Sequence, residues 1–383
     1  DHVSPSIYVP FRIKEDLGTS MVIWTTTPWT LPANMAVAVH PREQYSKLKV
    51  GREHYWVGES LIGQFTEVCK FENFEIVDTQ EGSSLVGKEC IHPFIDRSSP
   101  ILSAEYVTMD SGTGCVHIAP GHGLDDYLTG LDNGIEVYCP LDDKGCYVAD
   151  GSIPEELTGL SVLERSNGCA ANQKVIEILE RGNLLLAKQS HHHQYPHCWR
   201  SKTPVVFRAM DQWFVALDKD NLRNNCIEKL EDVNFTPDWG ANRIKGFLES
   251  RPDWCISRQR SWGVPIPVFF DEEGTPLVDS ELIRFLASRV ETEGSDIWFS
   301  LDEKSLLDGY ELDSEWKHKV LTKGTDTLDV WIDSGCSHRS VLKSNQDLSW
   351  PADLYLEGSD QHRGWFQSSL WTSMASYDSA PYK

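Results

Sequence analysis

Residues 21–34 have the sequence Met-Val-Ile-Trp-Thr-Thr-Thr-Pro-Trp-Thr-Leu-Pro-Ala-Asn. The apolar and β-branched residues that precede Pro28 are typical of a strand, and proline ends a strand because it cannot donate a ladder hydrogen bond. Successive strand side chains point to opposite faces, so three adjacent threonines cannot all face one core. The pattern predicts a strand that delivers hydroxyl groups to a loop at its end, where ligands often bind. A threonine-rich edge strand is the alternative, and composition alone favours it.

Other short stretches with the composition of strands follow, separated by glycine and proline: Ala36–Val39, Tyr55–Val57 and Gly114–Ile118. They predict that residues 1–185 form a β-rich domain with a barrel-like core. One helix is expected within it, from Val162 to Arg181, because apolar residues recur with helical spacing and Gly182 stops the pattern.

A chain of 383 residues is too long for one ordinary core, so we expect two or three domains in an α/β protein. Residues 186–250 are interpreted as a connector with a polar histidine run, a strand-like stretch at 204–207 and a helix near 217–230. Residues 251–383 form a further unit with a small acidic, helical insert at about 270–320.

The net charge of −23 argues against a general nucleic-acid binder, because phosphate binding needs clustered lysine and arginine. No apolar run approaches the roughly 18 residues of a membrane span, and the first residues lack the features of a signal peptide. The ten cysteines are scattered and form no C-x-x-C pair, as expected for reduced thiols. These features predict a cytoplasmic protein that does not enter a membrane.

A second stretch with potentially functional side chains is residues 112–127, with the sequence Gly-Thr-Gly-Cys-Val-His-Ile-Ala-Pro-Gly-His-Gly-Leu-Asp-Asp-Tyr. A strand ends in a turn where glycine allows the backbone to approach a ligand. We expect at least one of Asp125 and Asp126 to cap the helix that follows. With His117 they could also form a hydrolase or metal site, although no second ligand cluster has the spacing of a metal site.

The segments Thr25–Asn34 and Gly112–Tyr127 resemble the two signature segments of the editing domain of isoleucyl-tRNA synthetases. The leucine and valine relatives carry an arginine in the first segment, T-T-R-P, where this chain has Thr27, Pro28 and Trp29. The resemblance therefore implies the isoleucine branch, and an editing domain inserted in a Rossmann-like catalytic domain.

In that family an apolar pocket separates isoleucine from valine by only about 1–3 kcal/mol, so a second site hydrolyses the wrong product. The resemblance implies that Asp126 anchors the α-ammonium group of the wrongly attached amino acid. Thr25, Thr26 and Thr27 would contact the terminal adenosine, the ester and water. Asn34 and His117 complete the pattern. We expect water to attack directly, and the His117 ring to exclude isoleucine from the pocket.

Three later segments, residues 251–263, 326–335 and 357–366, resemble parts of the synthetic domain of the same family. They are similar to the re-entry into the nucleotide-binding fold, the strand lining the amino-acid pocket and the aminoacyl-adenylate segment. The resemblance implies that Trp331 and Trp365 flank the isoleucine side chain as a rigid apolar slot. It also implies that the adenylate is bound by Glu357, Gly358, Asp360 and Gln361. Core packing is the alternative role for the two tryptophans.

Two departures from the family pattern limit these expectations. The H-x-G-H and K-M-S-K-S segments that hold ATP in the family do not occur here, and the chain begins at Asp1 without methionine. We therefore expect the middle of a longer enzyme, with ATP a substrate of the parent and an incomplete Rossmann-like half. Cys198 and Ser201 break the C-x-x-C pair that some relatives place in a zinc knuckle, and the run His191–His193 is interpreted as solvated. We expect no zinc in this chain.

The hypothesis is hydrolysis of Val-tRNA(Ile), with the tRNA(Ile) 3′ end, valine and isoleucine as partners and a monomeric state. A non-catalytic fragment that binds the tRNA 3′ end is the first alternative. The editing domain of a valyl relative is the second, and a stand-alone metal hydrolase is the third.

Overall fold

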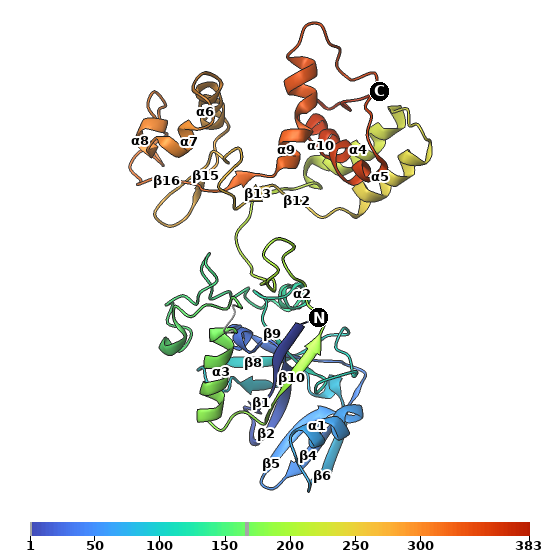
Figure 1. Ribbon diagram of the computed structural model, residues 1–383, viewed down its shortest axis with the longest axis vertical. Helices are drawn as coiled ribbons and strands as arrows, with labels where there is room; N and C mark the ends of the chain where they lie inside the picture. Colours follow the sequence, from blue (N-terminus) through green and yellow to red (C-terminus); the bar gives the residue numbers. More distant parts are fainter. Residues whose placement is uncertain (1, 165–167) are drawn as a thin grey trace. The chain divides into compact units, whose positions relative to one another are not determined.

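The computed structural model describes residues 2–164 and 168–383, which form two compact units, Asp1–Met210 and Asp211–Lys383 (Figure 1). The stretch at 186–250, expected to be a connector, contributes a strand to the first unit and two helices to the second. The functional boundaries at 185 and 250 remain predictions.

A ten-stranded mixed sheet is the centre of the first unit. Its order is β6-β4-β5-β2-β1-β7-β8-β3-β9, and β10 pairs with β1. The pairs β2/β5 and β3/β8 are parallel, and the other pairs are antiparallel. The strands are β1 (His2–Ile13), β2 (Asp16–Thr25), β3 (Ala36–Val39), β4 (Gln44–Val50), β5 (Glu53–Gly58), β6 (Glu75–Glu81), β7 (Glu89–Ile91), β8 (Ser98–Ser103), β9 (Cys115–Ile118) and β10 (Ala187–His193).

The strands expected at 36–39, 55–57 and 114–118 are confirmed as β3, part of β5 and β9. The alternative of an edge strand is wrong for β2 as a whole, because β2 pairs with β1 on one side and with β5 at Thr19–Met21 on the other, while Thr25 pairs with Ile7 of β1. β2 ends at Thr25, so Thr26 and Thr27 belong to the loop, as the alternation argument required.

The core of the first unit follows from the two-residue period of its strands. In β1, Ile7, Val9 and Phe11 lie in one buried cluster, whereas Tyr8 belongs to a second cluster on the other face. Both faces of this strand are therefore covered.

Helix α3 (Ala170–Arg181) covers the first cluster with Val175, Ile178 and other apolar residues, and it ends before Gly182 as predicted. Its predicted start at Val162 is wrong. Gly168 has a φ of 82°, which is not helical, and the Cys169 thiol caps the helix by accepting from Asn172 N at 3.4 Å. Residues 165–167 lie outside the described residues.

The other helices of the first unit are α1 (Ile62–Val68), α2 (Leu124–Asp132) and the short 3-10 turns η1 (Pro28–Ala33), η2 (Glu59–Leu61), η3 (Gly82–Ser84) and η4 (Glu155–Leu157). The histidine run, interpreted as a solvated stretch, is part of β10. His193 pairs with His2, and His191 pairs with Ser4. Only His192 of the run is exposed, because strand side chains alternate between the two faces of a sheet. The strand-like stretch at 204–207 contributes one isolated bridge, between His197 and Pro204.

The second unit packs α4 (Leu222–Lys229), α5 (Trp239–Ser250), α9 (Val330–Gly335) and α10 (Trp365–Tyr377) around a core that includes Leu248, Trp254 and Trp371. Its other turns are η5 (Lys219–Asn221), η6 (Leu230–Asp232), η7 (His338–Lys343) and η8 (Ser359–Arg363). The short strands β11 (Phe214–Val215) and β12 (Trp254–Cys255) form one pair, and β13 (Ser257–Arg258) and β17 (Thr327–Leu328) form another.

The predicted insert has a small core of its own. Helices α6 (Ser280–Glu293), α7 (Ile297–Ser300) and α8 (Glu303–Leu306) accompany a sheet of β14 (Phe269–Phe270), β15 (Pro276–Leu277) and β16 (Thr322–Lys323). Phe269, Leu282 and Trp298 are buried in its core.

A strand expected over 326–335 is largely wrong. Only β17 is extended there, and α9 begins at Val330 because the Asp329 carboxylate caps it by accepting from Trp331 N at 3.3 Å. Across the described ranges, no helix combines the length and the apolar character needed to cross a membrane.

Candidate functional site

The loop that follows β2, here called the threonine loop (residues 25–34), has its carbonyl groups bound by a neighbouring segment. His92 Nε2 donates to Leu31 O at 2.9 Å. Arg97 Nη1 donates to Pro32 O at 3.0 Å and to Asn34 O at 2.9 Å. Buried carbonyl groups need such donors, and these bonds fix the backbone of the loop.

The start of the loop is fixed from the opposite direction. Asn172, in the first turn of α3, accepts from Trp29 N at 2.9 Å, and the Tyr147 hydroxyl donates to Trp29 O. The loop is therefore tied to three segments that are distant in sequence. Such preorganisation is what a binding or catalytic site needs.

The side chains of the loop join one buried chain of hydrogen bonds. Thr27 Oγ1 lies 3.4 Å from Thr30 Oγ1, and Thr30 Oγ1 lies 2.9 Å from His117 Nε2. His117 Nδ1 lies 3.4 Å from Asn34 Nδ2, and Ser99 Oγ donates to Asn34 Oδ1 at 2.6 Å. The structure thus brings together Thr27, Asn34 and His117, three of the residues selected from the sequence.

Thr25 and Thr26 differ in their surroundings. Thr25 is buried, and its hydroxyl oxygen accepts from Thr27 N at 3.1 Å and lies 3.3 Å from Thr27 Oγ1. Thr26 is half-buried and takes no part in this chain of bonds. Thr25 therefore shapes the turn, whereas Thr26 and Thr27 keep part of their surface exposed.

His117 lies on β9 and is buried, and both of its ring nitrogens face side chains of the threonine loop. Burial lowers its pKa to about 4, and His122 adds to the effect. The ring is therefore neutral at pH 7. Because both nitrogens are engaged by neighbouring side chains, neither is free to accept a proton from a ligand.

Asp126 lies in the first turn of α2, and its Oδ2 accepts from Ala119 N at 2.9 Å, two residues beyond His117. Burial raises its pKa to about 6, the bond from Ala119 opposes this rise, and Asp125 adds to it. Within residues 2–164 and 168–383, no Lys, Arg or His side chain lies within ion-pair distance of Asp126. A carboxylate in this setting is ionised at pH 7 and unpaired.

The expectation that Asp125 or Asp126 caps α2 is wrong. Gly123 is the capping residue, and no side chain completes the cap. Asp126 instead binds the end of β9 through Ala119 N. Asp125, its neighbour in the same turn, is exposed.

The sequence did not single out Thr30, His92, Arg97 and Ser99. Thr30 lies inside the quoted segment, one helical turn after Thr27, and that spacing could have indicated it. His92, Arg97 and Ser99 come from a stretch without a recognisable motif. Only the fold brings them to the threonine loop.

In the second unit, Trp331 and Trp365 lie at the starts of α9 and α10. Trp365 Nε1 donates to Ser334 O at 2.8 Å, and its ring stacks on Tyr355 at 3.8 Å. Trp331 is 39% exposed. One tryptophan is therefore held by packing, and the other has a free face.

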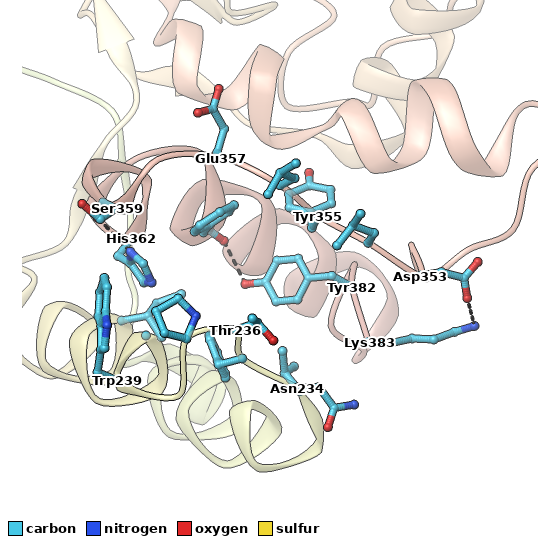
Figure 2. Close-up of a pocket in the computed structure, with 18 residues that line it drawn as sticks. Asn234, Thr236, Trp239, Asp353, Tyr355, Glu357, Ser359, His362, Tyr382 and Lys383 are labelled. Atoms are coloured by element: carbon cyan, nitrogen blue, oxygen red, sulfur yellow. Dashed lines mark hydrogen bonds and ion pairs between the residues drawn. The ribbon is translucent and has the colours of Figure 1, made fainter.

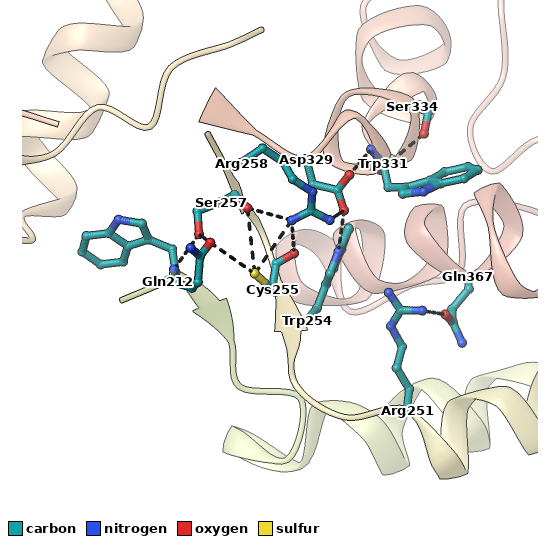
Figure 3. A network of polar contacts seen from close by, with 11 residues as sticks. Gln212, Arg251, Trp254, Cys255, Ser257, Arg258, Asp329, Trp331, Ser334 and Gln367 are labelled. Carbon is teal, nitrogen blue, oxygen red and sulfur yellow. Dashed lines mark hydrogen bonds and ion pairs between the residues drawn. The ribbon is translucent and has the colours of Figure 1, made fainter. Parts of the chain in front are cut away.

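Figure 3 shows the polar network that supports this region. Asp329 is 4% exposed and accepts from Arg258 Nη2 at 2.9 Å and from Trp254 Nε1 at 3.2 Å. Arg251 Nη1 donates to Gln367 Oε1 at 2.8 Å. Asp329 thus joins β12 and β13 to the start of α9, and the separate bond of Arg251 joins the end of α5 to α10. Sequence reasoning did not identify these contacts.

The remaining residues of the second unit selected from the sequence, Glu357, Gly358, Asp360 and Gln361, form the 357–361 turn. Their hydrogen bonds are local: Glu357 Oε2 accepts from Gly358 N at 2.7 Å, and Asp360 Oδ2 accepts from Gln361 Nε2 at 2.9 Å. All except Gln361 are exposed. The turn therefore offers free acceptors and donors to solvent.

A cavity of about 460 Å³ lies beside this turn, between residues 233–244 and 353–366 (Figure 2). Glu357, Ser359, His362 and Tyr355 line it. Trp331, Trp365, Asp360 and Gln361 do not line it, so the cavity and the predicted adenylate residues share only Glu357.

Among residues 2–164 and 168–383, no cluster of three or more His, Cys, Asp or Glu side chains is arranged to hold a metal ion. The ten cysteines are free thiols. The expectation about zinc remains a prediction.

A family model described as tRNA synthetases class I (I, L, M and V) matches residues 18–383. Curated proteins named isoleucine–tRNA ligase align with the whole chain. The relative from Petrotoga mobilis is 43% identical over 385 residues, the one from Syntrophotalea carbinolica 45% over 394, and the one from Sulfurihydrogenibium sp. 46% over 393. The alignments cover 41–42% of these relatives, so the chain spans about two fifths of their length.

Among solved structures, the crystal structure of GlLeuRS-CP1 aligns with 48% of this chain and 78% of its own, at 16% identity and a TM-score of 0.30. A likeness of this size carries no argument about the fold.

Proposed function

Because this chain belongs to the class I tRNA synthetases of the I, L, M and V group, we propose that its first unit edits tRNA by hydrolysing Val-tRNA(Ile). The parent enzyme would attach isoleucine to tRNA(Ile) with ATP as a substrate. The mixed sheet would be the barrel-like core of an editing domain inserted in a Rossmann-like catalytic domain, of which residues 251–383 are part.

One observation carries this proposal: Asp126 is a largely buried carboxylate without a cationic partner in the described residues, and it binds Ala119 N, two residues beyond the neutral His117 of β9, whose ring contacts the threonine loop. A buried charge is costly unless it is paired. The α-ammonium group of an esterified amino acid supplies that pair, and charge-assisted hydrogen bonds of this kind are strong.

The chemistry needs no nucleophile from the protein. Water attacks the ester carbonyl carbon, the bond to the ribose oxygen breaks, and that oxygen takes the proton that water loses. The products are free valine and tRNA with its terminal hydroxyl restored. Thr26 and Thr27, with part of their surface exposed, would orient water and the terminal adenosine. Thr25 and Asn34 would hold the loop, and His117 would be the wall that excludes isoleucine.

In the second unit, we propose that Trp331 and Trp365 flank the isoleucine side chain. Glu357, Gly358, Asp360 and Gln361 would contact the adenylate once the remainder of the ATP site is present. The chain would act as a monomer in the cytoplasm, on the 3′ end of tRNA(Ile), without zinc.

The test is deacylation by the 383-residue chain. We expect Val-tRNA(Ile) to be hydrolysed much faster than Ile-tRNA(Ile) and faster than the spontaneous rate. A chain that binds both charged tRNAs and hydrolyses neither would be the non-catalytic alternative. Hydrolysis that is abolished by a chelator would favour the metal hydrolase, and a preference for Thr-tRNA(Val) would favour the valyl relative.

A further inference from the structure

The directions of the two hydrogen bonds on the His117 ring can be assigned, because its side-chain neighbours Thr30 and Asn34 each contact a backbone carbonyl group. Asn34 Nδ2 lies 2.8 Å from Ala36 O, which can only accept. Thr30 Oγ1 lies 2.8 Å from Thr27 O, which also can only accept. The Asn34 amide nitrogen and the Thr30 hydroxyl are therefore donors at these contacts.

These two assignments fix the proton on His117. The Thr30 hydroxyl hydrogen is used on Thr27 O, so Thr30 Oγ1 accepts from His117 Nε2 at 2.9 Å. On the other side of the ring, Asn34 Nδ2 faces His117 Nδ1 at 3.4 Å, so Nδ1 must accept. Only the tautomer with its proton on Nε2 satisfies both contacts.

The orientation of the Asn34 amide depends in turn on Ser99. Ser99 Oγ donates to Asn34 Oδ1 at 2.6 Å, and both side chains are completely buried. No other protein donor bonds to Asn34 Oδ1 among the described residues. Without this hydroxyl the amide oxygen has no partner, and a buried unsatisfied acceptor is costly enough to favour another arrangement.

We propose that Ser99, on β8, is a positioning residue that sets the tautomer and orientation of His117 through Asn34, and so tunes the selection of the amino acid to be hydrolysed. The selection part rests on the proposed editing function, whereas the tautomer part does not. Ser99 touches no substrate in this proposal and acts through two other side chains.

In this proposal, hydrogen bonds fix the His117 ring, and the fixed ring excludes the larger substrate by its shape. A ring held by both nitrogens presents one fixed edge, and a packed wall discriminates by one methyl group because overpacking is unfavourable. A ring with a mixed tautomer loses the bond to Thr30 or the bond to Asn34 in part of the population. The wall then becomes less rigid, and the larger substrate gains access.

The experiment measures the ¹⁵N chemical shifts of the His117 ring nitrogens in the 383-residue chain, for the wild type, Ser99→Ala, Ser99→Thr and Ser46→Ala. Ser46 is the matched control, since it is also completely buried in a strand of the same unit and loses one hydroxyl partner, Thr79 Oγ1 at 3.0 Å. Signals are assigned by their disappearance in His117→Gln.

We expect the wild type, Ser46→Ala and Ser99→Thr to show a protonated Nε2 and an unprotonated Nδ1. We expect Ser99→Ala to show averaged shifts for the two nitrogens. The ratio of Ile-tRNA to Val-tRNA deacylation should rise about fivefold in Ser99→Ala, the factor that corresponds to one lost buried hydrogen bond, and should stay unchanged in the control.

If the nitrogen shifts of the wild type place the His117 proton on Nδ1, this result alone overturns the proposal. Unchanged nitrogen shifts in a folded Ser99→Ala also overturn it. Changed shifts with an unchanged deacylation ratio overturn the role in selection. If the wild type deacylates neither substrate, the editing function fails, while the nitrogen shifts still decide the role of Ser99.

Discussion

The threonine loop of the first unit and the 357–361 turn of the second unit are bonded in opposite ways. His117 meets Thr30 and Asn34 across 87 and 83 residues of sequence, and Ser99 meets Asn34 across 65. In the 357–361 turn, Glu357 and Asp360 bond to the residue that follows each of them. The polar groups of the threonine loop are bonded to distant parts of this chain, whereas those of the 357–361 turn are mostly exposed to solvent. Removing one side chain should therefore affect the two regions very differently.

The largest expected effect on deacylation comes from substituting Asp126. We expect Asp126→Ala to reduce deacylation of Val-tRNA(Ile) by about 100-fold or more, because a buried charge pair with the substrate ammonium is lost. Asp125→Ala is the matched control, since Asp125 lies in the same helical turn but is exposed. If the two folded variants deacylate equally well, Asp126 has only the structural role of binding Ala119 N.

Acid should weaken the first unit. Burial lowers the pKa values of His117 and His92 to about 4 and about 3, so the unfolded chain binds more protons below pH 6.5. Together, these two histidines should lower the free energy of unfolding by about 5 kcal/mol as the pH falls from 7 to 4.5.

Asp126 acts in the opposite sense, because its folded pKa of about 6 is above the unfolded value. Protonation of Asp126 should add about 2 kcal/mol to the free energy of unfolding as the pH falls from 7 to 4.5. Urea unfolding at pH 7 and pH 4.5 should show a loss that is about 2 kcal/mol larger in Asp126→Asn than in the wild type. Equal losses in both would contradict the raised pKa of Asp126.

A smaller effect on stability and deacylation is expected from substituting Asn172, which holds the threonine loop through Trp29 N. Asn172→Ala leaves Trp29 N without its acceptor, so we expect a loss of about 1–2 kcal/mol in the free energy of unfolding. Deacylation should fall by a few fold, since the loop is held less firmly. Unfolding and steady-state deacylation measure both, and full activity in a destabilised variant would show that the loop needs no such anchor.

The smallest effect is expected in the second unit. Asp360→Ala should change stability by less than about 0.5 kcal/mol, because Asp360 is exposed and its bond is local. We also expect no isoleucine-dependent ATP–pyrophosphate exchange by this chain. Exchange above background, or a clear loss of stability in Asp360→Ala, would mean that the 357–361 turn is more complete than its contacts indicate.

The sequence predicted local features better than long-range ones. The strands at 36–39 and 114–118 and the stop at Gly182 follow from local composition, and they are confirmed. The predicted start of α3 was wrong because Gly168, with a φ of 82°, interrupts the apolar pattern before Ala170. The partners Ser99, Arg97 and His92 could not be predicted, since residues of that kind are found throughout the chain and only pairing in the sheet brings them to the threonine loop. In the second unit, a strand was predicted over residues 326–335, but the Asp329 carboxylate caps a helix that begins at Val330.

The central claim is that His117 is a steric wall built into a complete editing site. The direct test compares deacylation of Val-tRNA(Ile) and Ile-tRNA(Ile) by the wild type and by His117→Ala, with folding of the variant verified by its thermal transition. We expect the wild type to spare Ile-tRNA(Ile), and the variant to hydrolyse it while retaining part of its activity on Val-tRNA(Ile). A folded variant that spares Ile-tRNA(Ile) as well as the wild type does would contradict this account.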